Sequence, residues 1–192
     1  MQKTPIRLAV IIGSNREGRI APTIGKWFLG QVKDRPEFEV DYIDLADINL
    51  PAVLPEKLDD DLKAYTARLD AADAFVMVVP EYNHSYPASL KQAIDLGYDE
   101  WRAKPIGFVS YGGFAAGVRS VEHLRGVFPE LHTVTVRDTV SFQNAWDQFD
   151  EKGVPHNPAG CAAAAGTMLH QLKWWAEALR TARNAVPYTV TE

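Results

Sequence analysis

Residues 8–19 read Leu8-Ala9-Val10-Ile11-Ile12-Gly13-Ser14-Asn15-Arg16-Glu17-Gly18-Arg19. The first five are apolar and largely β-branched, which predicts a buried strand, and the polar loop that follows breaks it. A helical pattern opens soon after at Pro22, a residue favoured in the first turn of a helix. A strand, a short loop and a helix start surround the loop with backbone N–H groups and the positive end of a helix dipole, which predicts a phosphate-binding site.

The side chains of this loop suit the same ligand. Ser14 supplies a hydroxyl donor, and Arg16 and Arg19 supply forked cations that match phosphate oxygens. Only Gly13 and Gly18 are glycines here, so the loop lacks the Gly-x-Gly-x-x-Gly pattern of a dinucleotide fingerprint. One terminal phosphate held by side chains fits the loop better than a pyrophosphate held by bare backbone. A solvated polar turn with incidental arginines is the alternative.

Apolar runs and helical patterns alternate along the rest of the chain. Strands are predicted at residues 7–12, 38–43, 74–79 and 106–110, with short β segments at 133–136 and 139–142. Helices are predicted at 22–33, 59–71, 88–97, 116–128 and 159–185. Residues 44–56 are predicted as a loop. The run 74–79 is apolar throughout, as expected of a strand buried on both faces.

This alternation predicts an α/β fold: a flavodoxin-like three-layer α/β/α sandwich with a five-stranded parallel sheet of order 2-1-3-4-5. The length of 192 residues predicts a single domain, 1–192. Such a sheet binds ligands beyond the carboxyl ends of its strands, where the first and third strands meet. The loops after the first, third and fourth strands are therefore expected to lie side by side.

Composition restricts the partners. The formal net charge of −5 argues against a nucleic-acid partner, which usually requires a basic surplus. No apolar run approaches the roughly 20 residues of a membrane span, and residues 1–5 lack a signal-peptide pattern, so a cytoplasmic location is expected. Cys161 is the only cysteine, which excludes an internal disulfide and a cysteine metal cluster. No metal site is predicted.

The loop after the third strand reads Pro80-Glu81-Tyr82-Asn83-His84-Ser85-Tyr86-Pro87. A tyrosine held between prolines offers a flat ring and a polar tip. Asn83 tolerates left-handed backbone. The alternative is a capped helix entry, with Ser85 or Ser89 as the cap and the tyrosines as packing. His84 has no evident proton partner, so an exposed position is expected rather than acid–base catalysis.

The loop after the fourth strand reads Ser110-Tyr111-Gly112-Gly113-Phe114-Ala115-Ala116-Gly117. Paired glycines let the backbone approach a flat ligand closely and donate their N–H groups to it. A flexible strand-to-helix turn is the alternative. Together the three loops offer phosphate donors, an aromatic surface and bare amides. That combination predicts a mononucleotide with a large planar ring.

The motifs Gly13-Ser14-x-Arg16, Pro80-Glu81-Tyr82-Asn83 and Ser110-Tyr111-Gly112-Gly113 resemble the signatures of the NADPH-dependent FMN reductase family, the flavodoxin-like quinone, azo and chromate reductases. The resemblance covers about residues 6–135 and includes the run Pro-x-x-Leu-Lys-x-Ala-x-Asp from Pro87 to Asp95. It implies bound FMN and two-electron hydride transfer through flavin N5, from NADPH or NADH to a quinone-type or other small acceptor. It also implies a homodimer, or a homotetramer built from dimers, packed through the helices after the third and fourth strands.

The resemblance also assigns residues to the cofactor. The FMN phosphate would be held by Ser14, Arg16 and Arg19, with backbone from Asn15, Ile20 and Ala21 near it. Many members carry a serine where this chain has Arg19, so Arg19 is assigned as a replacement donor. The isoalloxazine ring and ribityl chain would be wrapped by Pro80, Glu81, Tyr82 and Asn83, and the pyrimidine edge lined by Ser110, Gly112 and Gly113. The amides of these two glycines would stabilise charge on the ring.

No catalytic side chain is expected, because the flavin carries the chemistry. The alternative function is a flavodoxin-like FMN-binding electron carrier without NAD(P)H oxidation of its own. In a dimer, residues 97–101 are expected to reach the partner's flavin; the alternative is ordinary interface packing or a surface loop. Trp175 is expected in the core, and Trp174 at an interface or on the surface.

Overall fold

The central strands carry apolar side chains on both faces and therefore need cover on both sides. In the computed structural model, which describes residues 4–189, β1 (Ile6–Ile12) turns Leu8 and Val10 to one core and Ala9 and Ile11 to the other. β3 (Ala74–Pro80) alternates in the same way and is buried along its whole length. The predicted strand buried on both faces is confirmed.

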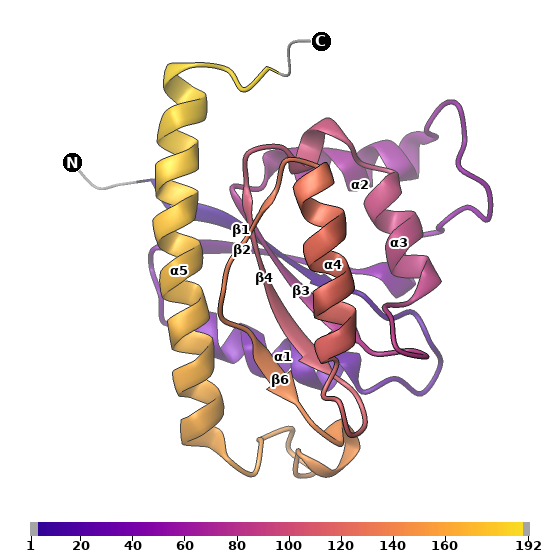
Figure 1. Cartoon of the computed structure of the whole chain (residues 1–192), viewed down its shortest axis with the longest axis vertical. Coiled ribbons are helices and arrows are strands. Elements are labelled where there is room, and N and C mark those ends of the chain that lie inside the picture. Colours follow the sequence, from indigo (N-terminus) through magenta and orange to yellow (C-terminus); the bar gives the residue numbers. More distant parts are fainter. Residues whose placement is uncertain (1–3, 190–192) are drawn as a thin grey trace.

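All strand pairs are parallel, and the sheet has the order β2-β1-β3-β4-β5 (Figure 1). Its other members are β2 (Phe38–Asp44), β4 (Pro105–Tyr111), β5 (Val134–Thr135) and β6 (Val140–Phe142). β5 pairs with the start of β4 and β6 with its end. The predicted order is confirmed. The edge position beside β4, predicted for a single fifth strand, is shared by the two short strands β5 and β6.

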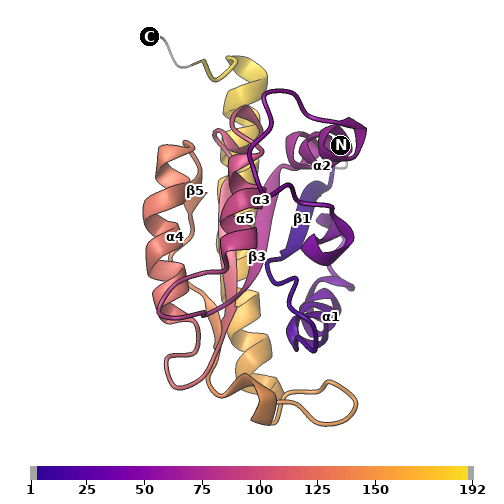
Figure 2. The same ribbon diagram turned by 90° about the vertical axis from the view of Figure 1, so that its right-hand side faces the viewer.

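Helices cover both faces of the sheet, in two layers (Figures 1 and 2). One face packs against α1 (Ala21–Val32) and α5 (Pro158–Ala185), and the other against α2 (Asp60–Ala71), α3 (Ala88–Asp95) and α4 (Val118–Glu130). The predicted flavodoxin-like three-layer sandwich is confirmed. Within residues 4–189 no helix has the length and apolar character needed to cross a membrane.

The loop prediction for residues 44–56 is wrong at its start. Asp44 is the last residue of β2, and a short 3₁₀ helix, η1 (Leu45–Asp47), follows it. The turn forms because the Asp44 carboxylate accepts a hydrogen bond of 3.0 Å from the Ala46 N–H. This places an acidic side chain at the carboxyl end of β2.

Two tryptophan predictions also need correction. Trp101, in η2 (Asp99–Trp101), is fully buried. Its ring centroid lies 4.6 Å from that of Phe75, so it is a core residue and not part of a surface that reaches a partner. Trp175 is 37% exposed, because Leu172 and Ala176 take the inward positions of α5. Trp174 is 60% exposed, as predicted.

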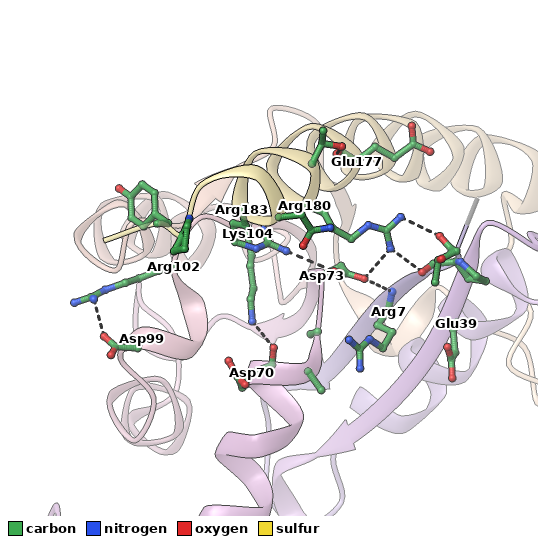
Figure 3. A pocket seen from close by; sticks show the side chains of 18 residues that line it. Arg7, Glu39, Asp70, Asp73, Asp99, Arg102, Lys104, Glu177, Arg180 and Arg183 are labelled. Atoms are coloured by element: carbon green, nitrogen blue, oxygen red, sulfur yellow. Dashed lines mark hydrogen bonds and ion pairs between the residues drawn. The ribbon is translucent and has the colours of Figure 1, made fainter. Parts of the chain in front are cut away.

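A buried carboxylate joins the amino ends of the strands to α5 (Figure 3). Asp73 accepts a 3.0 Å hydrogen bond from the Arg7 N–H and pairs with Arg180 at 3.1 Å and with Arg183 at 3.5 Å. These groups line a polar cavity of about 980 Å³. Because the ligand-binding edge of such a sheet is the opposite, carboxyl one, we interpret this network as structural.

The buried Lys104 at the same edge makes stability depend on pH. Its ammonium donates to the Leu69 and Asp70 carbonyls at the end of α2, at 2.9 and 2.8 Å. Burial disfavours the charged form and lowers the pKa of Lys104 to about 8 from 10.5. Between these two pKa values the unfolded chain binds more protons than the folded one, so the free energy of unfolding increases with pH.

From this group alone, the free energy of unfolding is expected to rise by about 2 kcal/mol between pH 7 and pH 9.5. Urea unfolding at both pH values measures it. Lys104→Met is expected to lose the rise, whereas Lys26→Met, on the exposed side of α1, keeps it. A rise of the same size in Lys104→Met would contradict the assignment.

Candidate functional site

The first and second predicted loops meet at the carboxyl edge of the sheet. The Ser14 hydroxyl lies 2.9 Å from the Tyr82 hydroxyl. The Ser89 hydroxyl, on α3, donates to the Asn15 side-chain oxygen at 3.0 Å. Two side-chain bonds therefore join the loop after β1 to the segment after β3, and the predicted meeting of these loops is confirmed.

The two arginines of the first loop differ in their ion pairing. Arg16 is exposed and makes no ion pair with any residue between 4 and 189. Arg19 instead makes two bonds to Asp44, Nη1 to Oδ1 at 2.6 Å and Nη2 to Oδ2 at 2.9 Å. Its Nη1 also donates to the Ser14 carbonyl. The two arginines predicted to act alike thus have different surroundings.

Helix α1 begins directly after this loop, with Ile20 as its N-cap and Ala21 as its first residue. Ile20 has no side-chain acceptor, so no side chain caps the first N–H groups of α1. Within the loop, Asn15 is exposed, whereas Ser14 is fully buried. The exposed polar groups of the loop are therefore those of residues 15–18.

The second loop turns through a two-residue hairpin. Tyr82 N–H donates to the Ser85 carbonyl at 2.7 Å, and Ser85 N–H donates to the Tyr82 carbonyl at 3.0 Å. The central residues, Asn83 and His84, have φ of 50° and 68°, the left-handed geometry of a type I′ turn. The left-handed conformation that we predicted as accessible to Asn83 is thus the one adopted.

The alternative of a serine cap on the following helix is wrong. The N-cap of α3 is Pro87, which provides no side-chain bond. The Ser85 hydroxyl lies 2.9 Å from His123 Nδ1 on α4, and the Ser89 hydroxyl bonds to Asn15. Both serines tie the loop to its neighbours rather than capping α3.

Helix α4 holds the second loop in place. The Ser120 hydroxyl lies 2.8 Å from the Pro80 carbonyl and 2.7 Å from the Ser85 carbonyl. Arg119 pairs with Glu81 at 2.6 Å. Sequence reasoning did not identify Arg119, Ser120 or His123, because no local motif marks them and their role depends on the packing of α4 against the loop.

In the third loop, two predicted donors are used within the fold. The Ser110 hydroxyl donates to the Ala116 carbonyl at 2.9 Å and lies 2.9 Å from the Ser141 hydroxyl. The Gly112 N–H donates to the Phe142 carbonyl at 3.2 Å, continuing the pairing of β4 with β6. Gly112 therefore offers a surface without a Cβ rather than an amide donor.

Gly113 keeps its amide available. Its N–H donates to no group in the described part of the chain, while its carbonyl accepts from the Ala116 N–H at 3.1 Å and the Asn144 N–H at 3.0 Å. A Cβ on Gly113 would lie 3.6 Å from the Trp146 ring. Trp146, which is 63% exposed, is an aromatic neighbour of the site that the sequence analysis missed.

Comparisons with known proteins show the family of this chain. The family model described as NADPH-dependent FMN reductase matches residues 6–181. The NAD(P)H-dependent FMN reductase C4B3.06c of Schizosaccharomyces pombe is 37% identical over 151 residues, covering 70% of this chain and 76% of that protein. The NAD(P)H:quinone oxidoreductase of Solanum tuberosum is 32% identical over 165 residues, covering 78% and 82%.

Among solved structures, the flavoenzyme NAD(P)H:(acceptor) oxidoreductase FerB of Paracoccus denitrificans superposes with a TM-score of 0.73, covering 90% of this chain and 98% of that one. At 19% identity this similarity supports the fold alone. The family model extends over most of the chain, and the relatives match it over two thirds or more of their length. The chain therefore belongs to the NADPH-dependent FMN reductase family.

Proposed function

We propose that this protein is an FMN-dependent NAD(P)H oxidoreductase that passes two electrons to a quinone-type or other small acceptor. The observation that carries the proposal is that all three loops with the family's motifs are joined at one edge of the sheet. FMN, when bound, supplies the redox chemistry. The residues of the chain bind and orient it.

The first loop fits a phosphate monoester. Arg16 is an exposed cation without an acidic partner in the described residues, and the N-terminus of α1 has no side-chain cap. We assign the phosphate to Arg16 and to the backbone of Asn15, Ile20 and Ala21. The predicted role of Ser14 as a phosphate donor is not kept, because its hydroxyl is buried and bonded to that of Tyr82, where it would hold the first loop against the second.

The second and third loops fit a planar ring. The prolines and the I′ turn hold Pro80, Glu81, Tyr82 and Asn83 in a fixed backbone conformation. The Gly113 N–H is a donor that the third loop has available, and Gly112 allows close approach. Ser110 would line the pyrimidine edge without donating, because its hydroxyl is used within the fold. A fixed amide facing the ring stabilises negative charge that develops on it.

Anaerobic stopped-flow reduction of the FMN-loaded protein by NADPH and by NADH tests the proposal. An oxidoreductase is reduced within seconds by at least one of them, and the comparison gives the donor preference. A protein that binds FMN but is reduced by neither is the electron carrier, the alternative function. A protein without affinity for FMN contradicts both.

His84 is not expected to transfer protons. It is exposed, and its left-handed conformation makes it a turn residue. His84→Asn removes the imidazole and keeps a residue that tolerates this backbone. NADPH oxidation is expected to stay within about tenfold of wild type, since the loss of a general acid or base costs roughly 10²–10⁴-fold. A steady-state loss above 100-fold would identify His84 as a proton donor.

We further propose a homodimer, or a dimer of dimers, assembled through α3 and α4. Val118 at the start of α4 is 49% exposed and Tyr98, just after α3, is 57% exposed. Tyrosine is enriched at protein interfaces, and the family resemblance assigns these two helices to the interface. Sedimentation equilibrium is expected to give an even multiple of the chain mass. A monomer at micromolar concentration would contradict the assembly.

A further inference from the structure

Arg19 and Asp44 form the tightest ion pair at the first loop. The two guanidinium–carboxylate bonds of 2.6 and 2.9 Å make the pair bidentate. Their side chains are only 16% and 10% exposed. The hydrogen bond to Asp44 raises the pKa of Arg19, so the guanidinium stays cationic. Arg19 is therefore occupied before any ligand arrives.

Asp44 is held by the sheet. It is the last residue of β2 and pairs in register with Ile12, the last residue of β1. Its Oδ1 also accepts from the Ala46 N–H. A carboxylate fixed by its strand and by the turn after it gives the partner guanidinium one position.

Arg19 transmits that position to the loop. Gly18, with φ of +65°, reverses the chain just before Arg19. The guanidinium then reaches back and donates to the carbonyl of Ser14. One side chain thus connects the end of the loop to its beginning and to the neighbouring strand, which closes residues 14–19 into a ring.

We propose that Arg19 and Asp44 are positioning residues that hold the phosphate-binding loop in its binding conformation, and that Arg19 is not itself a phosphate ligand. This inference rests on the FMN site proposed above. It divides the work between the two arginines of the loop: Arg16 meets the phosphate, and the Arg19–Asp44 pair fixes the backbone that meets it.

The sign of one substitution separates this role from direct binding. A carboxylate near a phosphate repels it. If Arg19 bound the phosphate directly, Asp44→Asn would remove a competing anion and FMN would bind equally well or more tightly. If the pair positions the loop, the same substitution loosens the loop and FMN binds more weakly, although the site becomes less negative.

The test is titration of the flavin-free protein with FMN and, separately, with riboflavin. Quenching of flavin fluorescence monitors binding and gives the two dissociation constants. Asp44→Asn keeps an oxygen for the Ala46 N–H, and it is expected to weaken FMN by about tenfold through loss of the charge-assisted pair. Riboflavin, which lacks the phosphate, should change less than threefold. FMN affinity equal to or above that of wild type would overturn the inference.

Arg19→Lys is the second variant. Lysine keeps a cation for a phosphate but cannot make the bidentate pair and bridge to Ser14 at once. The positioning role predicts a loss of FMN affinity as large as in Asp44→Asn. Retained affinity would assign Arg19 to the phosphate and overturn the inference.

Asp41→Asn is the matched control. Asp41 lies on the same strand and makes a similar bidentate pair with Arg68, at 2.9 and 2.5 Å, but it pairs with Ala9 in the middle of β1. The Asp41→Asn substitution should therefore leave the affinity for FMN unchanged. An equal loss in this variant would show that any broken pair on β2 weakens the site, which also overturns the inference.

Hydrogen exchange in the flavin-free protein gives a readout independent of the cofactor. The amides of residues 14–19 are expected to exchange faster in Asp44→Asn and not in Asp41→Asn. Unchanged exchange there would contradict the closed loop. Wild-type protein without FMN affinity would contradict the proposed function instead, so the two failures are distinguishable.

Discussion

Gly117→Ala is expected to weaken FMN binding more than 100-fold and to lower the free energy of unfolding by about 3 kcal/mol. Gly117 is the N-cap of α4 and has φ of 81°, a conformation that L-residues rarely adopt. A Cβ there would lie 2.7 Å from the Tyr111 nitrogen, 2.9 Å from its oxygen and 2.8 Å from Ser110 Cβ. Because Tyr111 ends a strand in the middle of the sheet, its backbone cannot yield without disturbing the second and third loops.

Gly126→Ala is the matched control for this prediction. Gly126 lies inside the same helix, and a Cβ there would meet nothing within 4 Å. Alanine is expected to stabilise the helix by roughly 0.5–1 kcal/mol and to leave FMN affinity unchanged. Urea unfolding and flavin titration measure both variants. Gly117→Ala with wild-type stability and affinity would show that the loop after β4 is far more plastic than its contacts indicate.

Arg16→Ala is expected to weaken FMN by about 30- to 100-fold, the effect of removing charge-assisted bonds to one phosphate. The affinity for riboflavin should change less than threefold, because the proposed ring site lies on the other two loops. The ratio of the two dissociation constants is therefore the measurement. High salt should reduce the difference between wild type and variant, because it screens exposed charges.

Arg137→Ala provides the control for net charge. Arg137 is 89% exposed and belongs to none of the three loops. Arg137→Ala removes the same charge from the protein as Arg16→Ala. It should leave the ratio of the FMN and riboflavin dissociation constants as in wild type. Equal losses of FMN and riboflavin in Arg16→Ala would place the phosphate elsewhere.

Much of the fold could be predicted because its signals are local. The continuous apolar run of β3 and the β-branched run of β1 mark strands buried on both faces, and their alternation with helices leaves few possible sheets. Asn83 is a residue that tolerates left-handed backbone, so its conformation in the second loop could be predicted from residue type. The three loops followed from sheet order, since parallel strands bring their carboxyl ends to one edge.

The predictions from sequence failed for side chains whose position or partner depends on how neighbouring helices and strands pack. A shift of one position on a helix rotates a side chain by about 100°, so Trp174 and Trp175 could not be assigned to core or surface from spacing alone. Asp44 and Arg19 are 25 residues apart. The predicted sheet order places the end of β2 beside the first loop, but nothing in either segment shows that these two side chains pair. Arg119 and Ser120 gain their hydrogen-bond partners only because α4 packs against the second loop, and no local pattern in the sequence shows that packing.

The sequence by itself therefore determined the class of fold, the sheet order, the family and the three loops that we propose as the cofactor site, because periodicity and motifs are properties of short stretches of chain. Only the tertiary structure decided which groups in those segments remain available. Arg19, Ser110 and the Gly112 N–H are already bonded to distant residues, whereas Arg16 and the Gly113 N–H have no such partner among residues 4–189. A hydrogen-bonding group can serve a ligand only when the fold has not already used it.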